Sequence, residues 1–161
     1  MNSTQHLLKV AAFLATTFLA AGATAQQKTS AVSGEEQYGL GDTRTVNTAE
    51  VTYASIYKTG YSANLLALGE GPSGTEPSAA HAGLITNELA RGEAHGYTFT
   101  YKPGAKDKDA AIRTYTLVAR PMKWQKGRVS YFTDQTGVIR WTKQNRAPTA
   151  KDEPIDSLPG L

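Results

Sequence analysis

The sequence predicts an α+β fold in which one helix packs on a four-stranded antiparallel sheet. Apolar residues recur at helical spacing in 43–58, whereas after Gly96 they alternate with polar residues, as in strands with one buried face. The connections between the expected strands are short, and short connections favour antiparallel neighbours. We therefore expect the helix to lie on one face of the sheet.

The helix expected at 43–58 has a buried stripe and a solvent side. The stripe consists of Val46, Ala49, Tyr53, Ile56 and Tyr57, and the residues off the stripe are Arg44, Asn47, Glu50 and Ser55. We expect the stripe to pack against the sheet and Glu50 to face water. Two starts compete, because Ser33 and Glu36 fit a capping box while Asp42 fits an N-cap after two glycines that weaken the helix.

Four segments show the strand pattern. They are 97–101, 114–120, 129–133 and 138–142, and a tight hairpin at 134–137 joins the last two. Between the helix and the first strand, Leu65 and Leu68 belong to a short capped turn that ends at Gly69, and we expect both side chains to join the core.

Residues 1–25 have the order of a secretory signal peptide. Lys9 precedes an uncharged apolar run at 10–21, and Ala23-Thr24-Ala25 forms a small-residue cleavage site. The apolar run is shorter than the about 20 residues that span a bilayer. We therefore expect export to the periplasm or the cell exterior, without a stable membrane anchor after cleavage. The mature chain would comprise one domain at 26–146, with a flexible leader at 26–33, and a flexible tail at 147–161.

The composition excludes several kinds of chemistry. The chain contains no cysteine, so it has no disulfide, no Cys-ligated zinc, no iron–sulfur cluster and no catalytic thiol. Outside the expected signal peptide the only histidines are His81 and His95, which is too few for a histidine-based metal site. No nucleophile elbow, P-loop or dinucleotide-binding motif is present. We expect no enzymatic activity, no cofactor and no metal, including calcium at the acidic residues of the tail.

Several stretches together resemble the head domain of bacterial type IV pilin-like and pseudopilin-like proteins. They are 45–53, 60–62, 65–69, 82–85, 96–101 and 131–140, in this order and spacing. The resemblance covers most of the expected mature chain. The pattern that opens the anchor helix of a pilin precursor, Gly then an aromatic residue with Glu five residues after the cut, is absent, and the expected signal peptide stands in its place.

The resemblance implies a helix packed on an antiparallel sheet and a function in assembly or surface contact. We therefore expect a secreted or periplasmic, non-catalytic domain that binds a protein partner, with a link to a pilus or a type II secretion system as a further implication. The missing anchor pattern argues against assembly into a filament, because subunits would share no buried apolar helix.

Basic residues predict an alternative function as an anion-binding module. Residues 113–146 contain eight Lys or Arg and a single acid, Asp134. The candidate anion-binding residues are Arg120, Arg128, Arg140, Lys143, Tyr131 and Trp141. Arg128 and Arg140 lie on the two arms of the expected hairpin, where they would bind DNA or acidic polysaccharide weakly if they shared a face. In the opposing interpretation the aromatic rings face the core and the cations are merely solvated.

Overall fold

The structure is a computed structural model that describes residues 33–160. The helical elements are α1 (Gly34–Tyr57), η1 (Leu65–Leu68), α2 (Asn87–Ala90) and η2 (Ile155–Ser157). The strands are β1 (Glu93–Ala94), β2 (Tyr97–Pro103), β3 (Tyr115–Pro121), β4 (Ser130–Asp134), β5 (Arg140–Thr142) and β6 (Glu153–Pro154). The expected signal peptide and most of the expected leader lie outside the described residues. No helix within 33–160 is long and apolar enough to cross a membrane.

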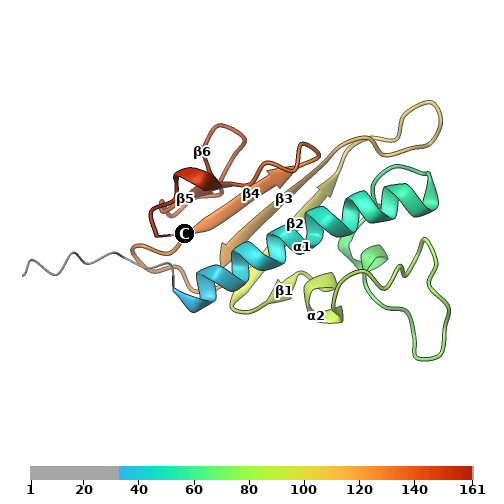
Figure 1. Cartoon of the computed structure of the whole chain (residues 1–161), viewed down its shortest axis with the longest axis horizontal. Coiled ribbons are helices and arrows are strands. Elements are labelled where there is room, and N and C mark those ends of the chain that lie inside the picture. Colours follow the sequence, from blue (N-terminus) through green and yellow to red (C-terminus); the bar gives the residue numbers. More distant parts are fainter. Residues whose placement is uncertain (1–32, 161) are drawn as a thin grey trace, which may run out of the picture.

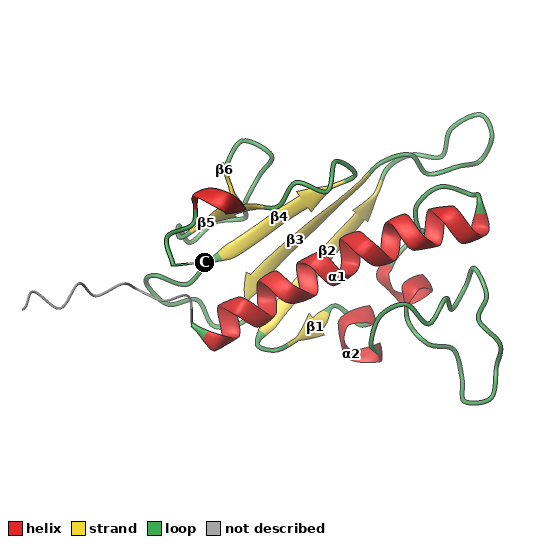
Figure 2. Cartoon of the chain, in the orientation of Figure 1, coloured by secondary structure: helices red, strands yellow, loops and turns green. Residues whose placement is uncertain are grey.

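The strands form one antiparallel sheet in the order in which they occur in the chain, and α1 crosses one face of it (Figures 1 and 2). The α+β class is thus confirmed. The sheet has six strands instead of the expected four, because short strands flank the four expected ones at both edges. The long loops that follow η1 and β2 lie at the end of the molecule where α1 ends (Figure 2).

Helix α1 begins at the first of the two competing starts. The Ser33 hydroxyl accepts from the Glu36 N–H (3.4 Å), and a Glu36 carboxylate oxygen accepts from the Ser33 N–H (2.8 Å), which completes the capping box. The helix continues through Gly39, which faces the sheet. The Tyr97 ring packs directly against Gly39 and leaves no room for a side chain. A Cβ at Gly39 would come within 2.7 Å of that ring.

The buried face of α1 is partly as expected. Val46, Ala49 and Tyr53 are buried, whereas Ile56 is 57% exposed and Glu50 is fully buried. The expectations for Ile56 and Glu50 were therefore wrong. The reason is geometric: positions 43, 46, 50, 53 and 57 follow one another at steps of three and four, so Glu50 lies on the midline of the face that meets the sheet.

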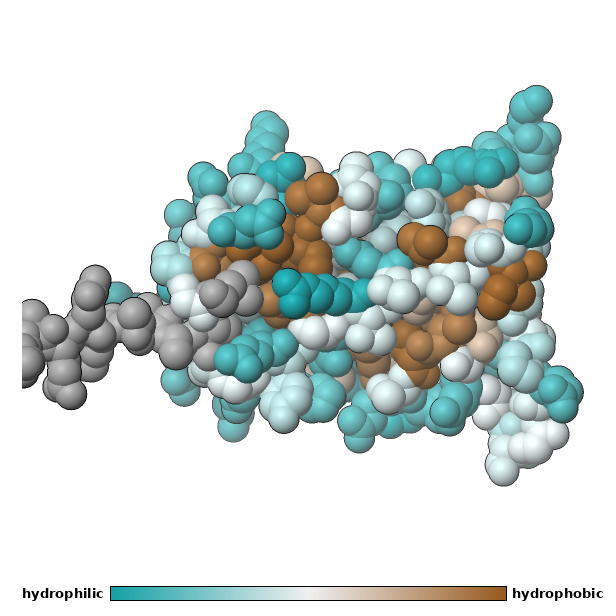
Figure 3. All heavy atoms as spheres, viewed as in Figure 1, coloured by the Kyte–Doolittle hydropathy of each residue, from teal (hydrophilic) through white to brown (hydrophobic). Residues whose placement is uncertain are grey.

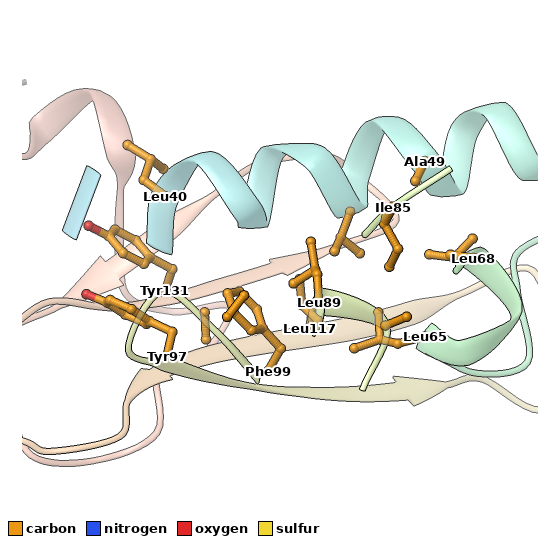
Figure 4. Packing of buried hydrophobic residues seen from close by; sticks show 14 of the residues in the cluster. Leu40, Ala49, Leu65, Leu68, Ile85, Leu89, Tyr97, Phe99, Leu117 and Tyr131 are labelled. Carbon is orange, nitrogen blue, oxygen red and sulfur yellow. The ribbon is translucent and has the colours of Figure 1, made fainter. Parts of the chain in front are cut away.

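The core fills the space between α1 and the sheet (Figure 4). Leu65 and Leu68 are buried in it, as expected. Tyr97 and Tyr131 are fully buried and stack on each other, with ring centroids 6.0 Å apart. Their hydroxyls donate to the backbone carbonyls of Val129 (2.8 Å) and Glu36 (3.0 Å) respectively, so these buried polar atoms are satisfied.

Residues 147–160 pack against the domain, in contrast to the flexible tail expected there. Strand β6 pairs with β5, and Leu158 is only 3% exposed. The Trp141 indole N–H lies within 3.2 Å of the Pro154 carbonyl and 3.1 Å of the Ser157 hydroxyl. Prolines suggest an unstructured tail, but a proline without an N–H is also tolerated in an edge strand, which is the position of Pro154.

Candidate functional site

The six candidate anion-binding residues do not form one surface. Tyr131 is buried beneath α1, and Trp141 packs against the core with its N–H directed to the C-terminal residues. The Tyr131 ring cannot stack on a nucleic-acid base, and the Trp141 ring is half-buried with its N–H already bonded within the domain. Lys143 places its Nζ 5.7 Å from the centroid of the Trp141 ring, so this cation lies against an aromatic side chain of its own domain.

Arg128 holds the first turn of α1. Its Nη1 lies 2.7 Å from a Glu35 carboxylate oxygen, its Nε lies 3.5 Å from Glu36, and its guanidinium lies 5.7 Å from the centroid of the Tyr97 ring. The side chain is only 16% exposed. Arg128 therefore belongs to the helix side of the molecule, and its charge is already neutralised by acids of α1.

Arg140 lies on the opposite face of the sheet from α1. It pairs with Phe132, the neighbour of the helix-facing Tyr131, and successive residues of a strand point to opposite faces. Its Nη1 donates to the Asp152 carbonyl at 2.9 Å. Arg128 and Arg140 therefore do not share one face, which was the condition for anion binding by the two arms of the hairpin.

Arg120 also projects from the outer face of the sheet, the face away from α1, and like Arg140 it has no ion-pair partner among the described residues. It is half-buried, lies opposite Thr98 of β2, and its Nη2 donates to the Asn145 side-chain oxygen at 3.0 Å. Arg120 and Arg140 share the outer face but lie on β3 and β5, with β4 between them. This leaves two separated cations where the sequence suggested a continuous stripe.

A buried polar network that the sequence did not indicate surrounds Glu50. Its two carboxylate oxygens accept from the Ser62 N–H (2.9 Å) and the Ser62 hydroxyl (2.6 Å), and the Tyr101 hydroxyl donates to the Ser62 carbonyl (2.9 Å). Burial raises the pKa of the Glu50 carboxyl, and the hydrogen bonds from Ser62 oppose that shift. Burial also raises the pKa of Tyr101 far above its ordinary value.

Glu50 and Ser62 combine a carboxylate with a hydroxyl, the residue types of a base and a nucleophile. Both residues are fully buried, so a substrate would reach the Ser62 hydroxyl only after local unfolding. The hydrogen bonds instead fix Ser62, in the segment that follows α1, to Glu50 in the middle of that helix. We interpret the network as structural.

His95 forms a second polar cluster at the β1–β2 turn. Its Nδ1 lies 2.9 Å from an Asp42 carboxylate oxygen of α1, and its ring stacks on Tyr38 with centroids 4.8 Å apart. His95 (φ 47°) and Gly96 (φ 79°) are the two central residues of the hairpin, and positive φ at both is the requirement of a type I′ turn. The strained backbone at His95 is thus explained by the turn, and the contact between His95 and Asp42 ties the turn to α1.

No group of three or more His, Asp or Glu side chains within 33–160 is arranged to hold a metal ion. His95 meets one carboxylate, that of Asp42, which is too few groups for a metal site. Of the acidic residues in the expected tail, Asp152 is used in the domain itself: the Arg146 guanidinium pairs with its carboxylate and lowers the pKa of that carboxyl to about 2.

The solvent face of α1 is the most unusual surface of the described chain. Between positions 45 and 57 the sole charged residue is Glu50, which is buried, so this stretch exposes only uncharged side chains. Val51 and Ile56 are 63% and 57% exposed. Figure 3 shows hydrophobic patches along and beside the helix. We call the exposed residues Thr45, Thr48, Val51, Ser55 and Ile56 the α1 surface.

Two shallow grooves flank the α1 surface. One, of about 510 Å³, lies between Asn47 and Thr48 of α1, the β4–β5 hairpin at Val138 and Ile139, and Ile155 near the C-terminus. The other, of about 370 Å³, is lined by further residues of α1 and by Leu84 of the loop before α2. The α1 surface is therefore a ridge between two grooves.

Comparison with known proteins gave no matching family model, no similar curated protein and no similar solved structure.

Proposed function

We propose that this chain is an exported, pilin-like and non-catalytic domain that binds a protein partner through the α1 surface. The observation that carries the proposal is the lack of exposed charge over residues 45–57, together with the exposure of Val51 and Ile56. A solvent-facing helix surface is normally charged or polar. Val51 and Ile56 lie on the two flanks of the exposed side of α1, with uncharged polar side chains between them. Exposed apolar side chains on an uncharged surface favour contact with another protein.

The chemistry of the α1 surface limits the kind of partner. Its own side chains carry no charge that could pair with phosphate or sulfate groups, so an extended polyanion has little to bind along the ridge. Charges occur only beside it, where Arg44 lines both grooves and Asp156 lines one of them. Threonine, serine and aliphatic side chains instead complement an uncharged, partly apolar protein surface. The two grooves allow a partner of complementary shape to bind, because its side chains can enter on both sides of the ridge.

The order of the elements also supports a pilin-like relationship. A long helix that precedes an antiparallel sheet and packs on one of its faces is the arrangement that the resemblance implies, although unrelated α+β domains share it. Polyanion binding along a continuous basic stripe has less support, since Arg128, Tyr131 and Trp141 are occupied within the domain.

Cysteine scanning can test this function directly, because the chain has no cysteine of its own. We would introduce Thr48→Cys on the α1 surface and, as a matched control, Thr100→Cys, an exposed threonine on the opposite face of the sheet. A short bismaleimide would then be added to the exported protein in its native setting.

The expected result is one discrete protein adduct from Thr48→Cys, no such adduct from Thr100→Cys, and loss of the adduct when Val51→Glu is added. Equal adducts from both cysteines, or an adduct that survives Val51→Glu, would contradict the proposed contact. The absence of any adduct from Thr48→Cys at native concentration would contradict it as well.

A further inference from the structure

Buried polar atoms without a hydrogen-bond partner are concentrated in one short part of the described chain. They are Arg120 Nε, Trp124 Nε1, Arg128 Nε, Arg128 Nη2 and Ser130 Oγ. All lie between positions 120 and 130, which comprise the end of β3, the connection from β3 to β4 and the first residue of β4. Folded proteins leave few such groups, because a buried donor without an acceptor is costly. This concentration indicates a site that is shaped for an acceptor.

Arg120 and Ser130 are cross-strand neighbours on the outer face of the sheet. The register of β3 and β4 runs to the pair Ala119–Tyr131, so Arg120 and Ser130 are the next positions. Ala119 and Tyr131 are fully buried on the helix side, which directs the following residues to the outer face. Directly opposed side chains in a sheet have Cβ atoms about 5 Å apart.

Trp124 lies in the eight-residue connection 122–129, which begins and ends at this cross-strand pair. The connection folds back on itself, since the Arg128 N–H donates to the Gln125 carbonyl at 3.0 Å. Trp124 is thus four residues from Arg120 and six from Ser130 along the chain, in a connection that is held at both ends by this cross-strand pair. The two unpartnered atoms of Arg128 are separate, because that guanidinium lies against Glu35 and Tyr97.

The electrostatics favour an anion at this position. Residues 120–130 include no acid, and Lys123 and Lys126 are exposed there. Arg120 has no carboxylate partner within the described residues, and its one hydrogen bond is to the neutral Asn145 side chain. The unpartnered groups at the site are a guanidinium N–H, an indole N–H and a hydroxyl, all of which can donate.

We propose that the β3–β4 connection binds a compact oxyanion, a carboxylate, sulfate or phosphate group, between the Arg120 guanidinium, the Trp124 indole N–H and the Ser130 hydroxyl. An oxyanion places several lone pairs in a small volume, which suits one planar guanidinium and two further donors. The donor atoms are covered in this structure, so entry of the anion requires movement of the connection 122–129. This site is independent of the α1 surface, and either proposal can fail without the other.

The test uses Trp124 as its own reporter. In a Trp141→Phe background Trp124 is the sole tryptophan, and its emission is titrated with sodium sulfate, phosphate or acetate at ionic strength held constant with chloride. We expect a saturable change with at least one of these anions. A rise in the melting temperature of the wild-type protein under the same conditions provides a second readout that does not depend on the Trp141 substitution.

Variants separate a built site from general charge attraction. Arg120→Ala should abolish the response, and Ser130→Ala should weaken binding about tenfold, as loss of a hydrogen bond to a charged group does. Lys102→Ala removes an exposed cation from the same sheet, and should leave binding within about twofold of wild type because this charge is screened. An equal loss in Arg120→Ala and Lys102→Ala, or no saturable response by either readout in the wild type, would overturn the proposal.

Discussion

Removal of the Glu50 side chain should weaken the fold far more than its position on a long exposed helix suggests. In Glu50→Ala the Ser62 N–H loses its acceptor, which costs about 1–3 kcal/mol. The Ser62 hydroxyl keeps the Asn64 carbonyl as an alternative acceptor at 3.0 Å, so it adds little. The space left by the buried side chain adds about 1–2 kcal/mol, by analogy with other large-to-small core substitutions.

The total loss of stability expected for Glu50→Ala is therefore about 3 kcal/mol. The matched control is Ile56→Ala, which removes an apolar side chain from the exposed side of the same helix and should change stability by less than about 0.5 kcal/mol. Urea unfolding followed by circular dichroism would measure both. If Glu50→Ala and Ile56→Ala shift the urea midpoint equally, the buried network does not stabilise the fold as described.

The same carboxyl should make stability depend on pH. Burial raises the pKa of Glu50 in the folded state above its ordinary value of 4.5, so the folded state binds the proton more tightly than the unfolded state. This contribution is fully present below pH 4.5 and is lost as the pH rises through the folded-state pKa. Glu50→Gln, which cannot ionise, should remove that decline; a decline of the same size in Glu50→Gln would assign it to another group.

Two further pairs of substitutions test the packing around α1 and of the C-terminal residues. Gly39→Ala should destabilise by about 1–3 kcal/mol because its Cβ meets the Tyr97 ring, whereas Gly41→Ala, with no neighbouring atom within 4 Å, should stabilise the helix by about 0.5–1 kcal/mol. Leu158→Ala should cost about 2–5 kcal/mol, against less than about 0.5 kcal/mol for the exposed Leu66→Ala. Thermal or urea unfolding measures each pair. Equal values within either pair would show that the assigned burial is wrong.

The sequence was enough to predict those parts of the fold in which buried positions hold apolar residues and exposed positions hold polar ones. The alternation in 97–101 identified β2 because Tyr97 and Phe99 are buried while Thr98 and Thr100 are exposed. Val46 and Tyr53 were assigned to the core by the same logic of periodicity. Glu50 was not, because a carboxylate is normally at the surface, and its acceptor role became visible only when Ser62 was placed beside it.

The sequence could not show which face of the sheet the candidate anion-binding residues occupy, and the reason is different. The hairpin predicts that Arg128 and Arg140 lie on neighbouring arms. Strand β4 begins only at Ser130, however, so Arg128 precedes the strand and its side chain turns toward Glu35. The alternation of faces cannot be extended beyond the end of a strand. The unpartnered donor of Ser130 likewise has no signature in the sequence, since it depends on which atoms the connection covers.

The two outermost strands of the sheet are each two residues long, and one of them includes Pro154. A passing chain that adds to a sheet needs a row of free N–H and C=O groups, and strands this short, one with a residue that has no N–H, provide almost none. At β1 and β6, edge-to-edge growth, the first step toward cross-β aggregates, therefore has little to start from. The backbone that a further chain could reach is instead that of β2, where residues 99–103 extend beyond the pairing with β1.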